Sequence, residues 1–161
     1  MTSKARISSV EPIAGKHALL VVFANGKRYS IDLREHIRSF PALKPLEDLA
    51  LFGTAQVGEW GFDVTWDNDL ELAATTLYRL ALEQAGEVMP VQAFKRWMAA
   101  NKLSLTTAAV ELGFTRRTIT AYSSGTALIP KHVALACKGW EFEHKSKKAN
   151  KTEGRKARHI A

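Results

Sequence analysis

Residues 104–122 read SLTTAAVELGFTRRTITAY, and this stretch predicts two short helices joined by one tight turn. Ser104 and Thr115 each stand where an N-cap hydroxyl would accept a hydrogen bond from an otherwise unpaired helix amide. Gly113 stands where the first helix must end in a left-handed conformation. The sequence therefore marks the start of both helices and the end of the first.

The side chains of this stretch divide between two faces. Apolar residues recur at helical spacing on one side, and they are Leu105, Ala108, Ala109, Leu112, Ile119 and Tyr122. The residues left on the outer face of the second helix are Arg116, Arg117, Thr120 and Ala121. This pattern is typical of a helix-turn-helix whose second helix, residues 115–122, enters the major groove of DNA.

Eight residues in or next to this segment have a predicted role in DNA binding. Arg116 and Arg117 are candidate base contacts, since a guanidinium can bond guanine O6 and N7 together. Thr120 is a candidate base or phosphate contact, and Ala121 a candidate contact to a thymine methyl group. The candidate phosphate contacts are Lys102, Ser104, Thr106 and Thr115. The alternative is that both arginines are surface charges on a helix used only for packing.

The charge is unevenly distributed along the 161 residues. Residues 1–89 hold nine Lys/Arg against twelve Asp/Glu (−3), and residues 90–161 hold fourteen against four (+10), which together give the net +7. A segment this basic attracts polyanions, and it contains the predicted helix-turn-helix. A solvated basic surface that aids solubility is the alternative.

Composition indicates an ordinary globular protein, with 46% apolar residues. The longest apolar run, residues 18–24, is too short to cross a bilayer, and residues 1–10 have no stretch of signal-peptide length. Cys137 is the single cysteine, so no internal disulfide can form. We therefore expect a cytoplasmic protein without membrane contact.

The first half predicts a small mixed α+β domain over residues 1–88. Strands are expected at residues 6–12 and 17–23, and Asn25-Gly26 is a strong hairpin signal before the alternating residues 29–33. Helical turns are expected at 33–40 and 45–49, and a second hairpin or strand pair within 54–66. From Leu72 the spacing predicts a helix that ends at Gly86.

The second half predicts an all-α bundle over residues 89–142, followed by a tail. Phe94, Trp97 and Met98 indicate an amphipathic helix, and Pro130 begins another that carries Val133, Cys137 and Trp140. Residues 143–161 hold seven Lys/Arg, two Asp/Glu and almost no apolar residues, so we expect a flexible basic tail. The fold class is therefore α+β, with an N-terminal domain of hairpins and a C-terminal helical bundle.

Residues 90–141 resemble the lambda-repressor-like (XRE-type) DNA-binding domain. The resemblance rests on residues 105–109, 112–119 and 122–125. It implies a four- or five-helix bundle that usually acts as a dimer. The chain departs from the family pattern at two positions, with Thr106 where members commonly carry glutamine and Ser123 where they often carry glutamate.

Residues 7–84 resemble the domain-of-unknown-function family 2442. The motifs that carry the resemblance are residues 23–27, 31–33, 45–46, 64–66 and 77–78. It implies a compact α+β fold, with members that often stand alone and some that sit beside toxin-like partners. Trp60, between Gly58 and Gly61, either lies at a loop tip as a partner contact or caps the sheet.

No pattern of catalytic residues stands out, and we expect no enzyme activity, cofactor or metal. The five histidines lack metal-ligand spacing, and they are His17, His36, His132, His144 and His159. Cys137 falls on the apolar stripe of a helix, which favours a structural thiol over a nucleophile. Asp63, Asp67 and Asp69 fit solvent-facing carboxylates better than a metal cage, and no glycine-rich phosphate loop is present.

The leading hypothesis is a dimeric, sequence-specific transcriptional regulator, a repressor or antitoxin-like protein, that binds duplex DNA through residues 115–122. In the alternative, the helical domain has lost DNA reading and the α+β domain captures a protein such as a toxin. The departures at Thr106 and Ser123 motivate this alternative. An enzyme with its site in the α+β domain is the least favoured hypothesis.

Overall fold

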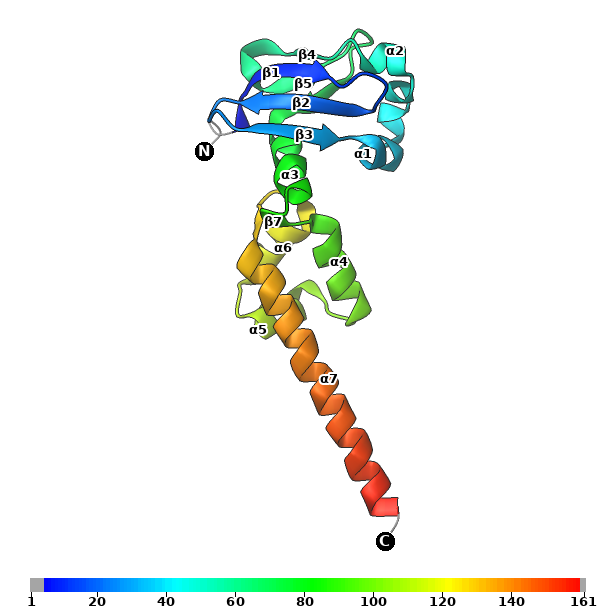
Figure 1. Ribbon diagram of the computed structural model, residues 1–161. Coiled ribbons are helices and arrows are strands. Elements are labelled where there is room, and N and C mark those ends of the chain that lie inside the picture. Colours follow the sequence, from blue (N-terminus) through cyan, green and yellow to red (C-terminus); the bar gives the residue numbers. More distant parts are fainter. Residues whose placement is uncertain (1–4, 160–161) are drawn as a thin grey trace. The chain divides into compact units, whose positions relative to one another are not determined.

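A computed structural model describes residues 5–159, and within it the chain divides into two compact units between Gly86 and Glu87. The N-terminal unit combines two small antiparallel sheets with helices, and the C-terminal unit is built mainly from helices (Figure 1). The α+β fold class predicted from the sequence is confirmed.

The first sheet of the N-terminal unit is an antiparallel meander. Its strands are β1 (Ile7–Pro12), β2 (Ala18–Phe23) and β3 (Arg28–Asp32). The β2–β3 turn contains Gly26 at φ 81°, and the Asn25 side-chain oxygen accepts a hydrogen bond from the Lys27 amide. Positive φ costs glycine little, which is why the Asn25-Gly26 pair predicted this hairpin correctly.

A second antiparallel sheet contains β4 (Gln56–Val57), β5 (Asp63–Thr65) and β6 (Glu71–Ala73). The β4–β5 pair confirms the strand pair predicted within residues 54–66. The helix expected from Leu72 begins only at Ala74, because Leu72 pairs with Val64 in the sheet. The apolar spacing of this segment fits a helix, and only the neighbouring strand makes its first residues extended.

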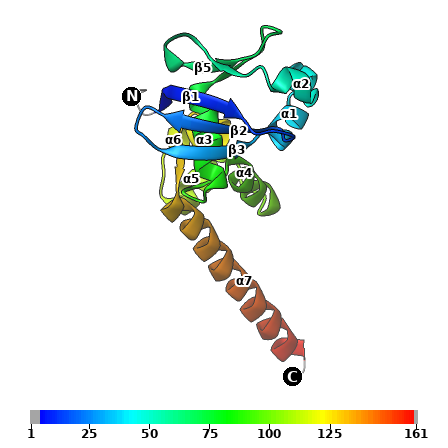
Figure 2. The ribbon, with the colours of Figure 1, turned by 45° about the horizontal axis from the view of Figure 1, so that its top comes forward.

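Helical segments connect and cover the sheets. They are α1 (Arg34–Ser39), the 3-10 helix η2 (Pro41–Glu47), α2 (Leu49–Phe52), the 3-10 turn η3 (Glu59–Gly61) and α3 (Ala74–Gln84). Phe40, just before Pro41, is extended at φ −123° and ψ 106°, as expected for a residue before proline. In Figures 1 and 2, α3 lies behind the first sheet.

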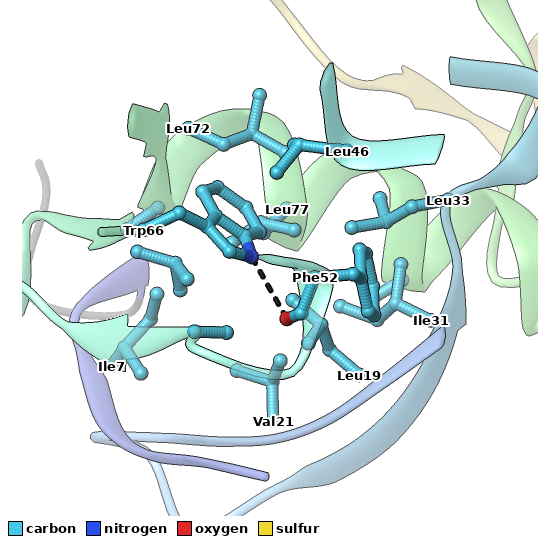
Figure 3. Packing of buried hydrophobic residues seen from close by; sticks show 14 of the residues in the cluster. Ile7, Leu19, Val21, Ile31, Leu33, Leu46, Phe52, Trp66, Leu72 and Leu77 are labelled. Carbon is cyan, nitrogen blue, oxygen red and sulfur yellow. Dashed lines mark hydrogen bonds between the residues drawn. The ribbon is translucent and has the colours of Figure 1, made fainter. Parts of the chain in front are cut away.

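The core of the N-terminal unit joins both sheets to α3. Leu19, Val21 and Ile31 from the first sheet pack in one cluster with Val64 and with Leu77 of α3. Figure 3 shows the indole of Trp66 among these side chains, where its Nε1 donates a 3.0 Å hydrogen bond to the Phe52 carbonyl. The buried polar atom of this tryptophan is therefore satisfied within the core.

One side chain of α3 closes the free edge of β3. The Gln84 side-chain oxygen accepts from the Asp32 amide at 2.9 Å, and the Gln84 amide nitrogen donates to the Asp32 carbonyl at 2.8 Å. Two hydrogen bonds of this kind replace those of a missing strand.

Four helices surround the core of the C-terminal unit, as the sequence predicts. They are α4 (Val91–Ala100), α5 (Leu105–Leu112), α6 (Arg116–Ser124) and α7 (Lys131–His159). Their shared cluster comprises Val91, Phe94, Trp97, Met98, Ala108, Ala109, Ile119, Tyr122, Ile129, Val133 and Cys137. Beyond the prediction, β7 (Val88–Met89) pairs with β8 (Ile129–Pro130) and ties the entry of α4 to the start of α7.

The segment predicted as a flexible tail differs from the expectation. Residues 143–159 continue α7 to His159, and the last two residues of the predicted tail lie outside the described residues. Lysine, glutamate and alanine are good helix formers, so a helix that is already packed at Val133 and Cys137 can propagate through them. The side chains of residues 145–154 are exposed, so this extension buries no apolar core of its own.

In the described part of the chain, every helix is too short or too polar to span a membrane.

Candidate nucleic-acid interface

Caps fix the ends of α5 and α6. The Ser104 hydroxyl accepts from the Thr107 amide at 3.1 Å, and the Thr107 hydroxyl accepts from the Ser104 amide at 3.2 Å, which forms a reciprocal capping box. The Thr115 hydroxyl accepts from the Thr118 amide at 3.2 Å. Gly113 ends α5 at φ 74°. The predicted starts of both helices and the predicted end of α5 are therefore confirmed, and the turn contains only residues 113–115. Helix α6 runs to Ser124, two residues beyond the end predicted for it.

The inner face of α6 is anchored in the core. Ile119 is fully buried and Tyr122 nearly so. The Tyr122 ring meets the rings of Phe94 and Phe114 edge to face, at centroid distances of 6.0 and 5.9 Å. Ala108 and Ala109 of α5 are buried beside them, and such small side chains let two helices approach closely. This packing holds α6 in one orientation.

The outer face of α6 carries all four predicted base contacts. Arg116, Arg117, Thr120 and Ala121 line one shallow, open hollow together with Ser124 and Thr126. The last two residues were missed from the sequence, because their place depends on the turn that follows Gly125 at φ 77°. The Thr120 hydroxyl donates to the Arg116 carbonyl at 2.9 Å, and its oxygen retains accepting capacity.

The two arginines of this hollow are exposed, and within the described residues neither guanidinium has a hydrogen-bond or ion-pair partner. Both lie in the first turn of α6, where the helix dipole is positive and cations are unfavourable. The first turn of α6 holds no acidic residue. Their position therefore does not stabilise the helix, whereas an anion placed there would be attracted by both charges and by the free helix amides.

The predicted phosphate contacts lie outside this hollow, and all four are exposed: Lys102, Ser104, Thr106 and Thr115. The hydroxyls of Ser104 and Thr115 are already engaged in capping. Lys102 stands in a turn at φ 55°. These four residues flank the ends of α5 instead of forming one cluster with the α6 side chains.

Two polar contacts brace α7 against the rest of the helical unit. Trp140 Nε1 donates a 2.6 Å hydrogen bond to the Glu111 carboxylate, and the Trp140 ring stacks on His144 at a centroid distance of 3.6 Å. The Asn101 side chain donates to Glu141 at 3.3 Å. The spacing of Trp140 and His144 suggests that they meet, but no sequence signal pairs either with Glu111.

The described residues contain no group of three or more His, Cys, Asp or Glu side chains that could hold a metal ion. Cys137 is buried in the helical core, and burial raises the pKa of its thiol to about 11. Its thiolate is thus scarce at neutral pH, as the interpretation of a structural thiol requires. The side chain of the fifth histidine, His159, lies outside the described part of the structure.

Trp60 in the N-terminal unit is 70% exposed and adopts φ 59°, a conformation that bulky residues rarely take. Its carbonyl accepts from Arg6 Nε at 2.9 Å, and the same guanidinium lies 5.4 Å from the ring centre of Phe62. Phe62 is itself 53% exposed. Of the two predictions for Trp60, the exposed turn is the one that the structure shows.

One comparison with known proteins matches the N-terminal segment, and another covers most of the chain. Residues 7–83 match the family model described as "Protein of unknown function (DUF2442)", which confirms the resemblance predicted for this segment. No curated protein matches the chain. Among solved structures, the chain is similar to "Putative DNA Binding Protein NE0471" from Nitrosomonas europaea ATCC 19718, with 35% sequence identity and a TM-score of 0.52. The match covers 84% of this chain and 86% of that one. The chain belongs to the same family as that Nitrosomonas protein.

Proposed function

We propose that this protein is a sequence-specific DNA-binding regulator of the lambda-repressor-like type, and that α6 reads the major groove of duplex DNA as part of a homodimer. The observation that carries the proposal is the outer face of α6. Two unpaired arginines, a hydroxyl and a small apolar surface share one open hollow there, while the opposite face is fixed in the core. The name of the Nitrosomonas relative supports DNA as the ligand.

Each residue has a role in this proposal. One arginine of the pair bonds guanine O6 and N7, and the other neutralises a phosphate. Thr120 accepts or donates at a base edge, and Ala121 contacts a thymine methyl group. Thr106 and Lys102 bind neighbouring phosphates of the DNA backbone, together with exposed main-chain amides at the capped helix ends. No enzymatic step and no cofactor enters this proposal.

The test begins with selection of bound duplexes from a random pool, followed by fluorescence anisotropy on a selected site and on a scrambled one. The double variant Arg116→Ala, Arg117→Ala is expected to lose more affinity for the selected site than for the scrambled one. The matched control, Lys147→Ala with Lys148→Ala, removes the same charge from exposed positions of α7. This control should weaken binding to both duplexes by the same factor. Equal affinity of wild type and the arginine double variant for every duplex at physiological salt would refute the proposal.

A protein-capture function of the N-terminal unit is the second candidate, favoured by the exposed Trp60 and Phe62. In this case, Trp60→Ala would abolish binding of a protein partner in pull-downs from cells, whereas the arginine double variant would keep it. Retention of DNA without any protein partner argues against this candidate.

A further inference from the structure

Helix α7 has a second face that the helical core does not use. Val133, Cys137 and Trp140 point into the core of the C-terminal unit. On the opposite side, Leu135 is 60% exposed and Phe142 is 74% exposed, with Gly139 between them. Successive residues of a helix turn by about 100°, so positions 135, 139 and 142 form one stripe. We call this stripe the outer α7 face.

We propose that the outer α7 face binds the same face of a second copy of this chain, with the two α7 helices parallel. Leu135 and Phe142 are seven residues apart, the repeat by which paired helices keep one seam in contact. Two large apolar side chains in a single stripe are costly to leave in water, and a symmetric pairing buries four of them. This inference rests on the homodimer of the proposed function, for which it names a surface and an orientation, and its test does not require DNA binding.

The charges beside the outer α7 face indicate both which partner binds there and in which relative direction the two helices run. One flank carries Lys131, Lys138 and Lys145, and the other carries Ala136, Glu143 and Asn150, all exposed. In an antiparallel pair the lysine flank would face itself. In a parallel pair it faces the other flank, and Lys138 of each copy lies within reach of Glu143 of its partner, five residues further along. The flanks are therefore self-complementary in the parallel direction only.

Gly139 gives independent support for a close helix–helix contact. A glycine inside a helix costs about 1 kcal/mol relative to alanine, so its place in the middle of an exposed helix needs a reason. A Cβ atom at position 139 would meet nothing within 4 Å in this chain, so packing within one copy does not demand glycine. A second helix that runs alongside α7 can approach closely at this position, because glycine has no side chain.

Sedimentation equilibrium of the full chain without DNA tests the interface. Wild type is expected to form a dimer, and Leu135→Glu or Phe142→Glu should lower the association constant at least about tenfold. The matched control is Leu49→Glu, which places the same charge at a 45% exposed leucine of the N-terminal unit and should leave the dimer intact. A monomeric wild type, or dimers unaffected by both glutamates, would overturn the proposal. Circular dichroism of each variant checks that the helices remain folded.

Charge exchange and cross-linking test the direction. Lys138→Glu and Glu143→Lys should each weaken the dimer, and the combined exchange should restore it. Ser146 lies on the outer α7 face, so oxidation of the Ser146→Cys variant should form a disulfide between the two copies of a parallel pair. Lys148 is exposed on the side of α7 toward the core, so the Lys148→Cys variant should not cross-link. No restoration by the exchange, or equal cross-linking at both positions, would contradict the parallel arrangement.

Discussion

Two arginines of each unit differ in what they contact. In the N-terminal unit, Arg34 pairs with Asp32 at 2.7 Å, and Arg79 pairs with Glu83 at 2.8 Å. In the C-terminal unit, Arg116 and Arg117 line an open hollow without a partner among the described residues. Two arginines of the first unit are engaged by carboxylates of that unit, whereas the second unit keeps two of its own arginines available for an external anion.

Helices α1 and α6 show the same contrast. Helix α1 has Glu35 in its first turn and His36 and Arg38 in its last, an order that favours the helix dipole. Helix α6 reverses this order, with two arginines in its first turn. An arrangement that opposes local stability is expected where a residue serves binding instead of folding.

The largest expected effect tests whether the α6 face depends on its core. Phe94 is fully buried against Tyr122, so Phe94→Ala should lower the free energy of unfolding by about 3–5 kcal/mol and weaken DNA binding with it. Urea unfolding followed by circular dichroism measures the loss. Phe62→Ala, at a 53% exposed phenylalanine of the N-terminal unit, is the control and should change far less. Similar losses for both variants would contradict the assigned core.

The next effect sharpens the contrast between paired and unpaired arginines. Arg116→Lys and Arg117→Lys keep the charge but lose the planar fork, so the variant at the guanine contact should lose about 1–3 kcal/mol of discrimination between selected and scrambled DNA. The salt dependence of binding should stay as in wild type. Anisotropy titrations over a salt series measure both quantities. Arg34→Lys, at the paired arginine of the N-terminal unit, should change neither, and a loss of discrimination there would break the comparison.

A smaller effect separates capping from DNA contact in α5. Ser104→Ala removes the N-cap hydroxyl and should destabilise the C-terminal unit by about 1 kcal/mol. Thr106→Ala, at an exposed residue two positions later, should leave thermal stability nearly unchanged and weaken DNA binding through a lost phosphate contact. Thermal melts paired with anisotropy distinguish the two. Equal losses of stability in the Ser104→Ala and Thr106→Ala variants would show that the N-cap hydrogen bond of Ser104 adds no measurable stability.

The smallest effect concerns pH and belongs to the N-terminal unit. Burial, followed by the charge of Arg79, lowers the pKa of His36 below its usual value of 6.5. The unfolded chain then binds the proton more readily than the folded one, so stability should fall as the pH drops through about 6.5 and return above it. Urea midpoints on either side of that pH measure the change. His36→Gln should flatten this dependence, while His132→Gln on the exposed surface of α7 should leave it as in wild type.

The predicted site followed from local signals. Ser104, Gly113 and Thr115 act on amides and dihedral angles within four residues, so their effect does not depend on the rest of the fold. The apolar spacing of Ile119 and Tyr122 then leaves Arg116 and Arg117 outside. Ser124 and Thr126 escaped prediction, because their place in the hollow depends on the turn at Gly125.

By itself, the sequence determined the features whose causes lie close together along the chain: the Asn25-Gly26 hairpin, the capped helices around residues 113–115, and the concentration of positive charge after residue 89. Only the tertiary structure decided that Leu72 joins a sheet, that β7 pairs with β8, and that Glu111 receives the Trp140 indole. The last two contacts join residues that are far apart in the sequence, and the first joins Leu72 to a neighbouring strand. Short segments have too little intrinsic preference to select such partners, so packing around each core makes the choice.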